Sequence, residues 1–256
     1  QELSFEDARK FAIENLIDLI ALGLNKRNTE VIIDTLTMNP KIYGLAVKIA
    51  KKLTLNTIKA VYGFSNESNI GLHFYPAIQA AHILYPTAEK QLPSLVVISV
   101  DQDPHMRVAR DVAARLSLFK PAALESRFLK GLSGEEKMNA SNPNSAIYVS
   151  DAPDNIKRKI WKAFTGGQPT ISEQRKYGGD PSVCPIYEYN AFFFDTLDQA
   201  RRRYELCRGG ELLCGECKME LTEKILRFLK EHNKKREKAK GKISEFLDVD
   251  VSVYLS

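Results

Sequence analysis

The strongest constraint on the fold is the apolar run "SLVVISV" (Ser94–Val100), which stops abruptly at Asp101 and Gln102. A continuous apolar run of this length is typical of a parallel strand that is buried on both faces. The next residues, "DPHMRVARDVAARL", read as a helix that Asp103 can cap and Pro104 can open. Because α/β proteins bind ligands where a strand ends and a helix starts, the segment predicts an α/β fold with a polar site at this edge.

The rest of the first half alternates helical and strand patterns. Ser4 and Asp7 have the spacing of a capping box, and "KIYGLAVKIAKKL" and "LNTIKAVYGF" read as helices. The β-branched run "EVIID" (Glu30–Asp34) predicts a short strand. An α/β domain with a partial, Rossmann-like parallel sheet over residues 1–150 is the resulting expectation.

After residue 150 the strand patterns nearly vanish. Asp151 and Pro153 predict a helix start, and two further capping boxes are Thr170 with Glu173 and Thr196 with Gln199. A long helix follows in "CKMELTEKILRFLKEHNKKREKAKGK". Residues 151–256 are therefore expected to form an all-helical second domain.

Composition fits a two-domain chain without naming its partner. With 256 residues, of which 44% are hydrophobic, the chain can bury a substantial core. A net charge of +5 permits a polyanionic partner but does not require one. No sequence window resembles a membrane span, and four cysteines fit a reducing compartment. The lysine run from Lys234 to Lys242 reads as a solvated helix end, with contact to an RNA backbone as the alternative.

Two polar stretches besides Asp101 and Gln102 could carry chemistry. In "GEEKMNASNPNS" a lysine stands in a turn-prone polar loop, which is either a solvated surface turn or a mobile phosphate-handling loop. In "YPAIQAA", Gln79 shares a helix face with Tyr75, so it either points into a pocket or is one tolerated polar residue on a packed helix. No Walker or dinucleotide fingerprint is present, and the histidines form no triad.

The cysteines raise the question of a structural metal. "CRGGELLCGEC" contains one Cys-x-x-Cys pair, Cys214 and Cys217, with Cys207 before it and Cys184 further off. A structural zinc site is expected to need a second close pair or a suitably spaced histidine. No metal is therefore expected, and the four residues are interpreted as ordinary buried thiols.

Taken together, these stretches resemble one family, the tryptophanyl-tRNA synthetases of the archaeal and eukaryotic cytoplasmic type. "KMNAS" resembles the Lys-Met-Ser-Lys-Ser loop of class I synthetases. "VDQDPHMRVARDVA", "FYPAIQAA", "VYGFSNESNIG", "AFTGGQPTISEQRKYGGDP" and "LLCGECK" resemble further family segments in the same order. Asn139 stands where the family usually has serine. The glycine pairs around "ISEQRKYGG" differ from the pattern of the sister tyrosyl enzyme.

The resemblance implies an activity and roles for single residues. Family enzymes join tryptophan to ATP with the help of Mg²⁺, release pyrophosphate and pass the tryptophanyl group to tRNA(Trp). The catalytic cation would be Lys137, and the ATP-binding residues would be Lys137, Met138, Asn139 and Ser141. Gln79 and Gln102 would bind tryptophan. The helical part would read the anticodon, and the protein would be a cytoplasmic homodimer with no membrane or DNA partner.

One departure concerns the start of the chain. The family carries a His-x-Gly-His signature in its first half, whereas no histidine here is followed by x-Gly-His. The similarity begins at "ELSFEDARKFAIEN", so Gln1 is expected to follow a missing part of the catalytic domain, and the 256 residues alone are expected to be inactive. Three alternatives remain open: a non-catalytic RNA-binding fragment, a tyrosyl-tRNA synthetase, and an unrelated nucleotidyl transferase.

Overall fold

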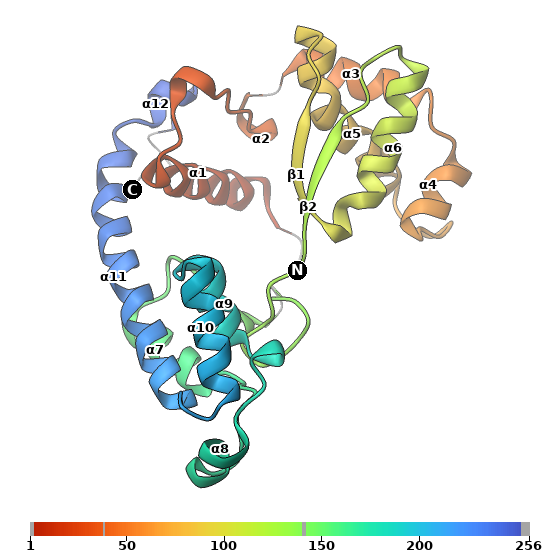
Figure 1. Ribbon diagram of the computed structural model, residues 1–256. Coiled ribbons are helices and arrows are strands. Elements are labelled where there is room, and N and C mark those ends of the chain that lie inside the picture. The colour runs from red at the N-terminus through yellow and green to blue at the C-terminus, as the bar shows by residue number, and fades with distance from the viewer. Residues whose placement is uncertain (1–2, 38, 140–141, 252–256) are drawn as a thin grey trace. The chain divides into compact units, whose positions relative to one another are not determined.

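The computed structural model describes residues 3–37, 39–139 and 142–251, and it divides into two compact units. The sheet unit comprises residues 1–17, 24–127 and 242–256, and the helical unit comprises residues 18–23 and 128–241. Helix α1 (Phe5–Leu22) contributes residues to both units (Figure 1). The described residues include no helix that is both long enough and apolar enough to span a membrane.

The sheet unit consists of helices and two strands. Its helices and strands after α1 are η1 (Lys26–Asn28), α2 (Asp34–Thr37), α3 (Pro40–Ala50), α4 (Leu55–Tyr62), α5 (Ile70–Lys90), β1 (Leu95–Ser99), η2 (Val100–Gln102), α6 (Asp103–Arg115), β2 (Ala122–Ser126) and α12 (Ile243–Phe246). Strands β1 and β2 pair in parallel, from Leu95 opposite Ala122 to Ser99 opposite Ser126. Helix α6 makes the crossover between them, which confirms the predicted α/β fold with a parallel strand followed by a helix.

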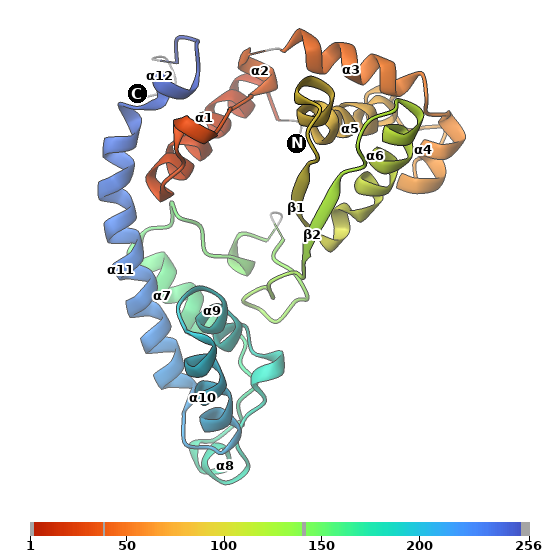
Figure 2. The same ribbon diagram turned by 45° about the horizontal axis from the view of Figure 1, so that its top comes forward.

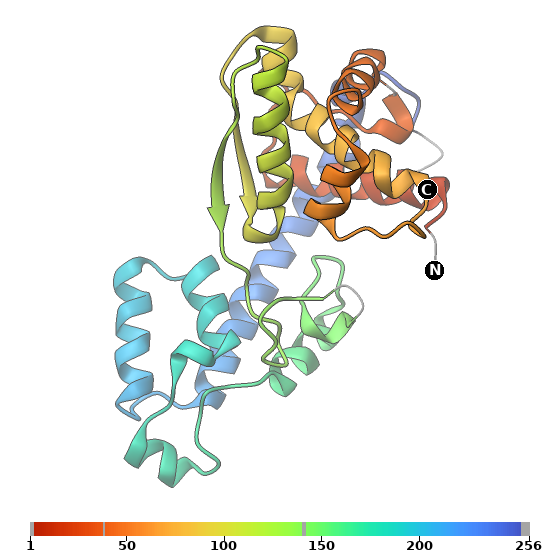
Figure 3. The same cartoon turned by 90° about the vertical axis from the view of Figure 1, so that its right-hand side faces the viewer.

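The prediction that β1 is buried on both faces is wrong. Val96 and Ile98 pack against the core, whereas Leu95 is 65% exposed and Val97 is 72% exposed. The reason is visible in Figure 3, where α6 covers one face of the two-stranded sheet. In the described structure the opposite face, which also carries Leu124, has no helix packed against it.

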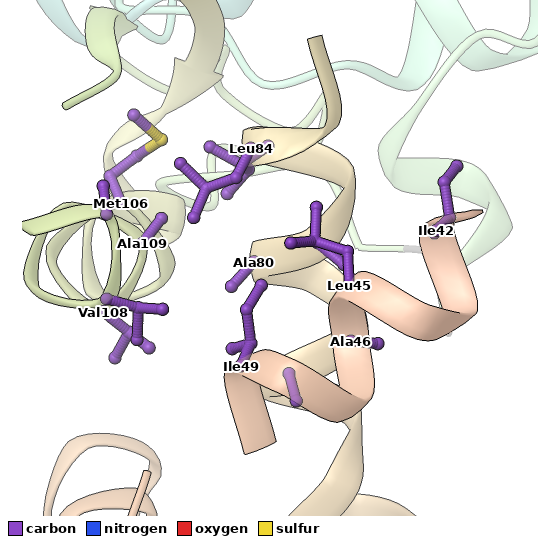
Figure 4. Close-up of a cluster of buried hydrophobic side chains, with 14 residues drawn as sticks. Ile42, Leu45, Ala46, Ile49, Ala80, Leu84, Met106, Val108 and Ala109 are labelled. Carbon is purple, nitrogen blue, oxygen red and sulfur yellow. The ribbon is translucent and has the colours of Figure 1, made fainter. Parts of the chain in front are cut away.

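The core of the sheet unit lies between α3, α5 and α6 (Figure 4). Ile49 of α3, Leu84 of α5 and Met106 of α6 are completely buried. Small residues such as Ala80 and Ala109 let the three helices approach closely, because a methyl group leaves room for the larger side chains opposite. This packing fixes α5 and α6 beside β1. Gln79 lies on α5, and Gln102 ends η2, the short turn between β1 and α6.

The predicted strand at "EVIID" is also wrong. Glu30 to Ile33 are neither helical nor extended in a sheet, and Asp34 begins α2. Thr37 explains the difference, because its hydroxyl accepts a hydrogen bond from the Ile33 amide at 3.2 Å and donates to the Ile33 carbonyl at 3.0 Å. Side-chain bonds of this kind satisfy the backbone locally and compete with strand pairing.

The helical unit packs its helices along the longest of them. Its elements are η3 (Pro143–Ser145), α7 (Pro153–Lys162), α8 (Ile171–Tyr177), η4 (Pro181–Val183), α9 (Pro185–Phe193), α10 (Leu197–Arg208) and α11 (Cys214–Lys240). Helices α7 and α9 pack on α11 (Figure 2). Their shared core includes Ile156, Ile160, Ile186 and Leu221, all fully buried.

Two predicted helix starts are confirmed and one differs in detail. Thr196 and Gln199 form a complete capping box, and the Thr170 hydroxyl accepts from the Glu173 amide at 3.2 Å. Helix α7 begins at Pro153 as expected, but Asp151 does not cap it. Its carboxylate instead accepts a 2.6 Å hydrogen bond from the buried Lys159 ammonium.

The chain passes from the sheet unit to the helical unit between Arg127 and Phe128, so the lysine loop packs with the helices. The functional division into residues 1–150 and 151–256 stays a prediction.

Candidate functional site

The described residues of the predicted lysine loop are held in place by one buried serine. Ser145, with no exposed surface, accepts a 2.9 Å hydrogen bond from the Asn139 amide and donates toward the carbonyls of Asn139 and Asn142. Its own carbonyl accepts from the Leu132 amide at 2.8 Å. The segment "NPNS" that follows the loop therefore closes it, through bonds of the Ser145 hydroxyl to the backbone that do not depend on the lysine.

Lys137 and Met138 point to different environments. The Lys137 side chain is exposed, and its ammonium lies 4.9 Å from the centre of the Phe128 ring. Met138 packs against the core, and its thioether accepts a 3.5 Å hydrogen bond from the Tyr189 hydroxyl. The methionine thus anchors the loop while the neighbouring lysine stays accessible to solvent. This is the arrangement a cation needs if it is to meet a bound anion.

Of the other two predicted ATP-binding residues, the structure describes one. Asn139 is exposed, but its backbone is fixed by Ser145. Ser141 lies outside the described residues. The predicted roles of Lys137, Met138 and Asn139 toward ATP stay predictions.

The two predicted tryptophan-binding amides lie in the sheet unit. Gln79 is half-buried on α5, and its Oε1 accepts a 3.2 Å hydrogen bond from the Tyr75 hydroxyl, one helical turn away. Gln102 is also half-buried and ends η2, immediately after β1. Its side chain does not cap α6. The amide therefore stands at the carboxyl end of the strand, where the sequence pattern predicts a ligand.

A group of rings lies between Gln79 on α5 and the first turn of α6. Tyr75 makes an edge contact with His105 at 5.8 Å between ring centres, and His105 lies in the first turn of α6, close behind Gln102. The Tyr62 hydroxyl lies 3.2 Å from His105 Nδ1. The sequence predicts no role for His105, because it belongs to no triad. Its ring contacts arise from the packing of α4, α5 and α6, which local sequence does not show.

Burial shifts the pKa values of His105 and Tyr62. Burial lowers the pKa of His105, although the charge of Asp101 raises it, so the imidazole is neutral near pH 7. Burial and the neighbouring Tyr75 raise the pKa of Tyr62 to about 12. The group thus offers uncharged aromatic faces beside Gln79 and at the start of α6. Such surroundings suit a flat, mostly apolar ligand with a few hydrogen-bonding groups.

The predicted residues fall into two sets in different units. Lys137, Met138 and Asn139 follow one another in one loop of the helical unit, and Gln79 and Gln102 belong to the sheet unit. A common cleft for the two sets stays a prediction.

Comparison with known proteins identifies the family. Residues 4–230 match the model of the family "tRNA synthetases class I (W and Y)". The chain is 49% identical over 247 residues to the tryptophan–tRNA ligase of Pyrobaculum arsenaticum, which covers 96% of the chain and 66% of that protein. The tryptophanyl-tRNA synthetase of Aeropyrum pernix aligns with a TM-score of 0.85 and 34% identity, covering 93% of this chain and 66% of that one. The synthetase of Giardia lamblia aligns with a TM-score of 0.85 and 31% identity, covering 99% and 70%.

The chain spans slightly less than two thirds of the length of the curated relatives it matches, between 63% and 66% for those of Pyrobaculum and Thermococcus. The match nevertheless runs through both units, so it covers the lysine loop as well as the two amides. On this similarity in sequence and fold, the chain belongs to the class I tRNA synthetases for tryptophan and tyrosine, within the tryptophanyl-tRNA synthetase branch.

Proposed function

We propose that the protein to which these 256 residues belong is a tryptophan–tRNA ligase. It would activate tryptophan with ATP and transfer the tryptophanyl group to tRNA(Trp). The observation that carries the proposal is the exposed Lys137 on a loop fixed by Ser145, in a chain 49% identical to a tryptophan–tRNA ligase over 96% of its length. The proposal includes a cytoplasmic location and a homodimer.

In the first step the tryptophan carboxylate attacks the α-phosphorus of ATP, and the bond to the bridging oxygen of pyrophosphate breaks. Negative charge moves onto the leaving pyrophosphate. Lys137 would stabilise this charge most strongly in the transition state, where it accumulates. Mg²⁺ bound to the triphosphate would supply further positive charge. Because Met138 is packed against Tyr189, the lysine would be carried on a backbone that is already positioned.

The amides would supply selectivity for the amino acid. We assign Gln102 as acceptor of the indole N–H and Gln79 to the amino-acid end of the same ligand. A buried acceptor that loses its donor is left unpaired, so the site would discriminate against a side chain without an N–H. The neutral ring of His105 and the Tyr75 ring would cover the indole without adding charge.

A substrate analogue tests this assignment. The protein to use is the chain joined at Gln1 to the preceding segment of the Pyrobaculum arsenaticum relative, here called the completed chain. We expect it to prefer tryptophan over the analogue with sulfur in place of the indole nitrogen by about 10- to 100-fold in kcat/KM for ATP–pyrophosphate exchange. Gln102→Leu should abolish most of that preference. An unchanged preference in the variant would remove Gln102 from the tryptophan site.

The helical unit would contact tRNA. Its α11 ends in a lysine-rich segment, and Trp161 is 66% exposed beside the cationic side chains of Lys157 and Lys218, a combination that suits a stacked base near a phosphate. The 256-residue chain can be tested directly for binding to tRNA(Trp) at several salt concentrations. We expect binding that weakens as salt rises and that prefers tRNA(Trp) over other tRNAs. Salt-dependent binding without such a preference, together with a completed chain that lacks exchange activity, would favour the non-catalytic RNA-binding alternative.

A further inference from the structure

A small cavity of the helical unit lies beside the lysine loop. Its described walls come from the turn just before the loop, from η3 directly after the loop, and from the last turns of α7. The cavity encloses about 210 Å³, less than the ~300–1,000 Å³ that is typical of pockets for a whole small molecule. It therefore suits a single chemical group rather than a complete nucleotide or amino acid.

The charge around this cavity is positive. The charged side chains among the described residues that line it are Arg158, Lys159 and Lys162, all of them on α7. Lys159 is buried, and Asp151 neutralises its ammonium at 2.6 Å. Within the described structure, Arg158 and Lys162 form no ion pair with a carboxylate. Two cations are thus left uncompensated at one cavity, and such a cavity attracts an anion.

The Arg158 guanidinium is held in a fixed orientation by two amide oxygens. Its Nη2 donates to the Asn144 Oδ1 at 3.1 Å and to the Asn155 Oδ1 at 2.5 Å. A guanidinium has five N–H donors, and these bonds use only the two on Nη2. Among the described residues, none accepts a hydrogen bond from Nε or Nη1 of Arg158. This remaining edge of the guanidinium suits phosphate oxygens, which arginine binds through two parallel hydrogen bonds.

The C-terminal end of α7 does not repel an anion as a bare helix end would. Unpaired carbonyl groups give a helix C-terminus a partial negative charge. Here the Lys218 ammonium, from α11, donates to the carbonyls of Trp161 at 2.7 Å and Ala163 at 2.8 Å. Because this cation compensates the carbonyl groups, Arg158 and Lys162 determine the charge that an anion in the cavity would meet.

The surface next to the cavity indicates the source of the anion. Arg158 also lines the neighbouring groove that contains the exposed Trp161. Trp161 and Lys162 follow Arg158 at i+3 and i+4 on α7, the two spacings that make side chains neighbours on a helix. A base stacked on Trp161 would therefore bring an adjoining phosphate to Arg158 and Lys162. A free phosphate ion has no base and would leave the tryptophan unused.

We propose that the cavity binds one phosphate of the tRNA backbone through Arg158 and Lys162, while the neighbouring Trp161 stacks on a base. The inference rests on the proposed function, because it takes tRNA as the partner. It places the phosphate next to the lysine loop, since Asn144, which holds Arg158, directly precedes the Ser145 that holds the loop. A backbone contact carries no sequence information, so the cavity would raise the affinity for different tRNAs equally.

The test is tRNA binding by the 256-residue chain, measured by fluorescence anisotropy of labelled tRNA(Trp) and of a second tRNA at several salt concentrations. In the double variant Arg158→Gln/Lys162→Gln, we expect the dissociation constant to rise about 10- to 100-fold for both tRNAs. The salt dependence of log K should become shallower by about 1, as one lost phosphate contact requires. The control Arg201→Gln/Arg202→Gln removes the same charge from an exposed part of α10 and should change the dissociation constant less than about threefold.

A second variant separates the lost contact from a folding defect. Lys162 is exposed and makes no hydrogen bond or ion pair with another described side chain, so its replacement leaves the fold intact, as circular dichroism can verify. We expect Lys162→Glu to weaken tRNA binding by about 10-fold or more. Arg202→Glu, an equal change of charge on α10, should weaken it less than about threefold.

Two results would overturn the proposal. One is equal tRNA affinity in the double variant and its control, or a 256-residue chain that binds no tRNA. The other is binding of inorganic phosphate that the double variant loses while its tRNA affinity stays unchanged, because the cavity would then belong to a free anion.

The ligase itself is tested separately by ATP–pyrophosphate exchange of the completed chain, a reaction that needs no tRNA. Exchange activity together with an unaffected tRNA affinity in the double variant would refute the phosphate cavity alone. Absent exchange together with weakened tRNA binding in the double variant would refute the ligase alone.

Discussion

Replacing Ser145 by alanine should loosen the lysine loop without unfolding the chain. The hydroxyl accepts from the Asn139 amide at 2.9 Å and donates to the Asn142 carbonyl at 2.7 Å, and it also lies 3.1 Å from the Asn139 carbonyl. Because a hydroxyl has one proton, it donates to one carbonyl at a time, and the variant loses two hydrogen bonds. At about 1 kcal/mol each, the loss is about 2 kcal/mol, and it is smaller where water replaces the lost partner.

The lost hydrogen-bond energy sets how much more often the loop opens locally. Asn139 is exposed, so its freed amide can bind water and no full desolvation cost arises. Between 1 and 2 kcal/mol corresponds to an opening equilibrium about 5- to 30-fold larger. Hydrogen exchange of the Asn139 amide, followed by NMR, should accelerate by that factor, while amides in the core of α11 keep their rates.

The matched control is Ser133→Ala, which changes an exposed serine in the same segment. It should leave the exchange of the Asn139 amide unchanged. Equal protection of that amide in Ser145→Ala and in the unaltered chain would refute the view that this buried hydroxyl closes the loop.

Three further predictions concern the helical unit. Arg203→Met should lower the free energy of unfolding by about 1–3 kcal/mol in a denaturant titration, because the Asp195 carboxylate, whose side chain is 3% exposed, loses its 2.7 Å partner but keeps its 2.8 Å ion pair with Lys224. Arg202→Met, at the exposed neighbour, should stay within about 0.5 kcal/mol. Equal effects would contradict the buried pair. Arg203 lowers the pKa of Glu220 to about 2, and the pKa of Asp195 is also lowered. The stabilisation that these ionised carboxylates give the fold is therefore complete above about pH 4.5 and is lost as pH falls toward 2. Thermal melts should show this loss of stability between about pH 4.5 and 2. Glu220 should contribute well under 3 kcal/mol, on the order of 1 kcal/mol, because its side chain is 42% exposed. In Arg203→Met the melting temperature should depend less on pH. Gly178→Ala should lower the free energy of unfolding by more than about 3 kcal/mol, because the φ of Gly178 is +70° and a Cβ would lie 1.8 Å from the Arg208 carbonyl oxygen of α10. Gly44→Ala, in α3, should leave stability unchanged, because nothing lies within 4 Å of its Cβ position.

Local patterns in the sequence predicted the local structure well. The capping box at Thr196 is present in full, and the helix that begins with Asp103 and Pro104 follows its strand as expected. These signals depend on residues within one turn of each other, so no knowledge of the fold is needed. The strand predicted at "EVIID" is absent because the Thr37 hydroxyl, outside that run, hydrogen-bonds the Ile33 backbone and replaces strand pairing there.

Features that depend on distant contacts could not be predicted. Strand β2, "AALES", has few strand-forming residues and exists because it pairs with β1. The placement of His105 against Tyr75, and the packing of Cys184 and Cys217 in one core, both require helices to pack first. For the lysine loop, the resemblance implied a role for Lys137, which stays a prediction. The role of Ser145 depends on a fold of the segment that the spacing alone does not specify.

The most direct test of the central claim is tryptophan-dependent ATP–pyrophosphate exchange by the completed chain and its Lys137→Ala variant. If Lys137 stabilises the charge of the leaving pyrophosphate, kcat should fall about 10²- to 10³-fold with little change in the affinity for tryptophan, and Lys120→Ala, at an exposed lysine of the sheet unit, should retain full activity. A Lys137→Ala variant that exchanges within twofold of the unaltered protein would contradict the account.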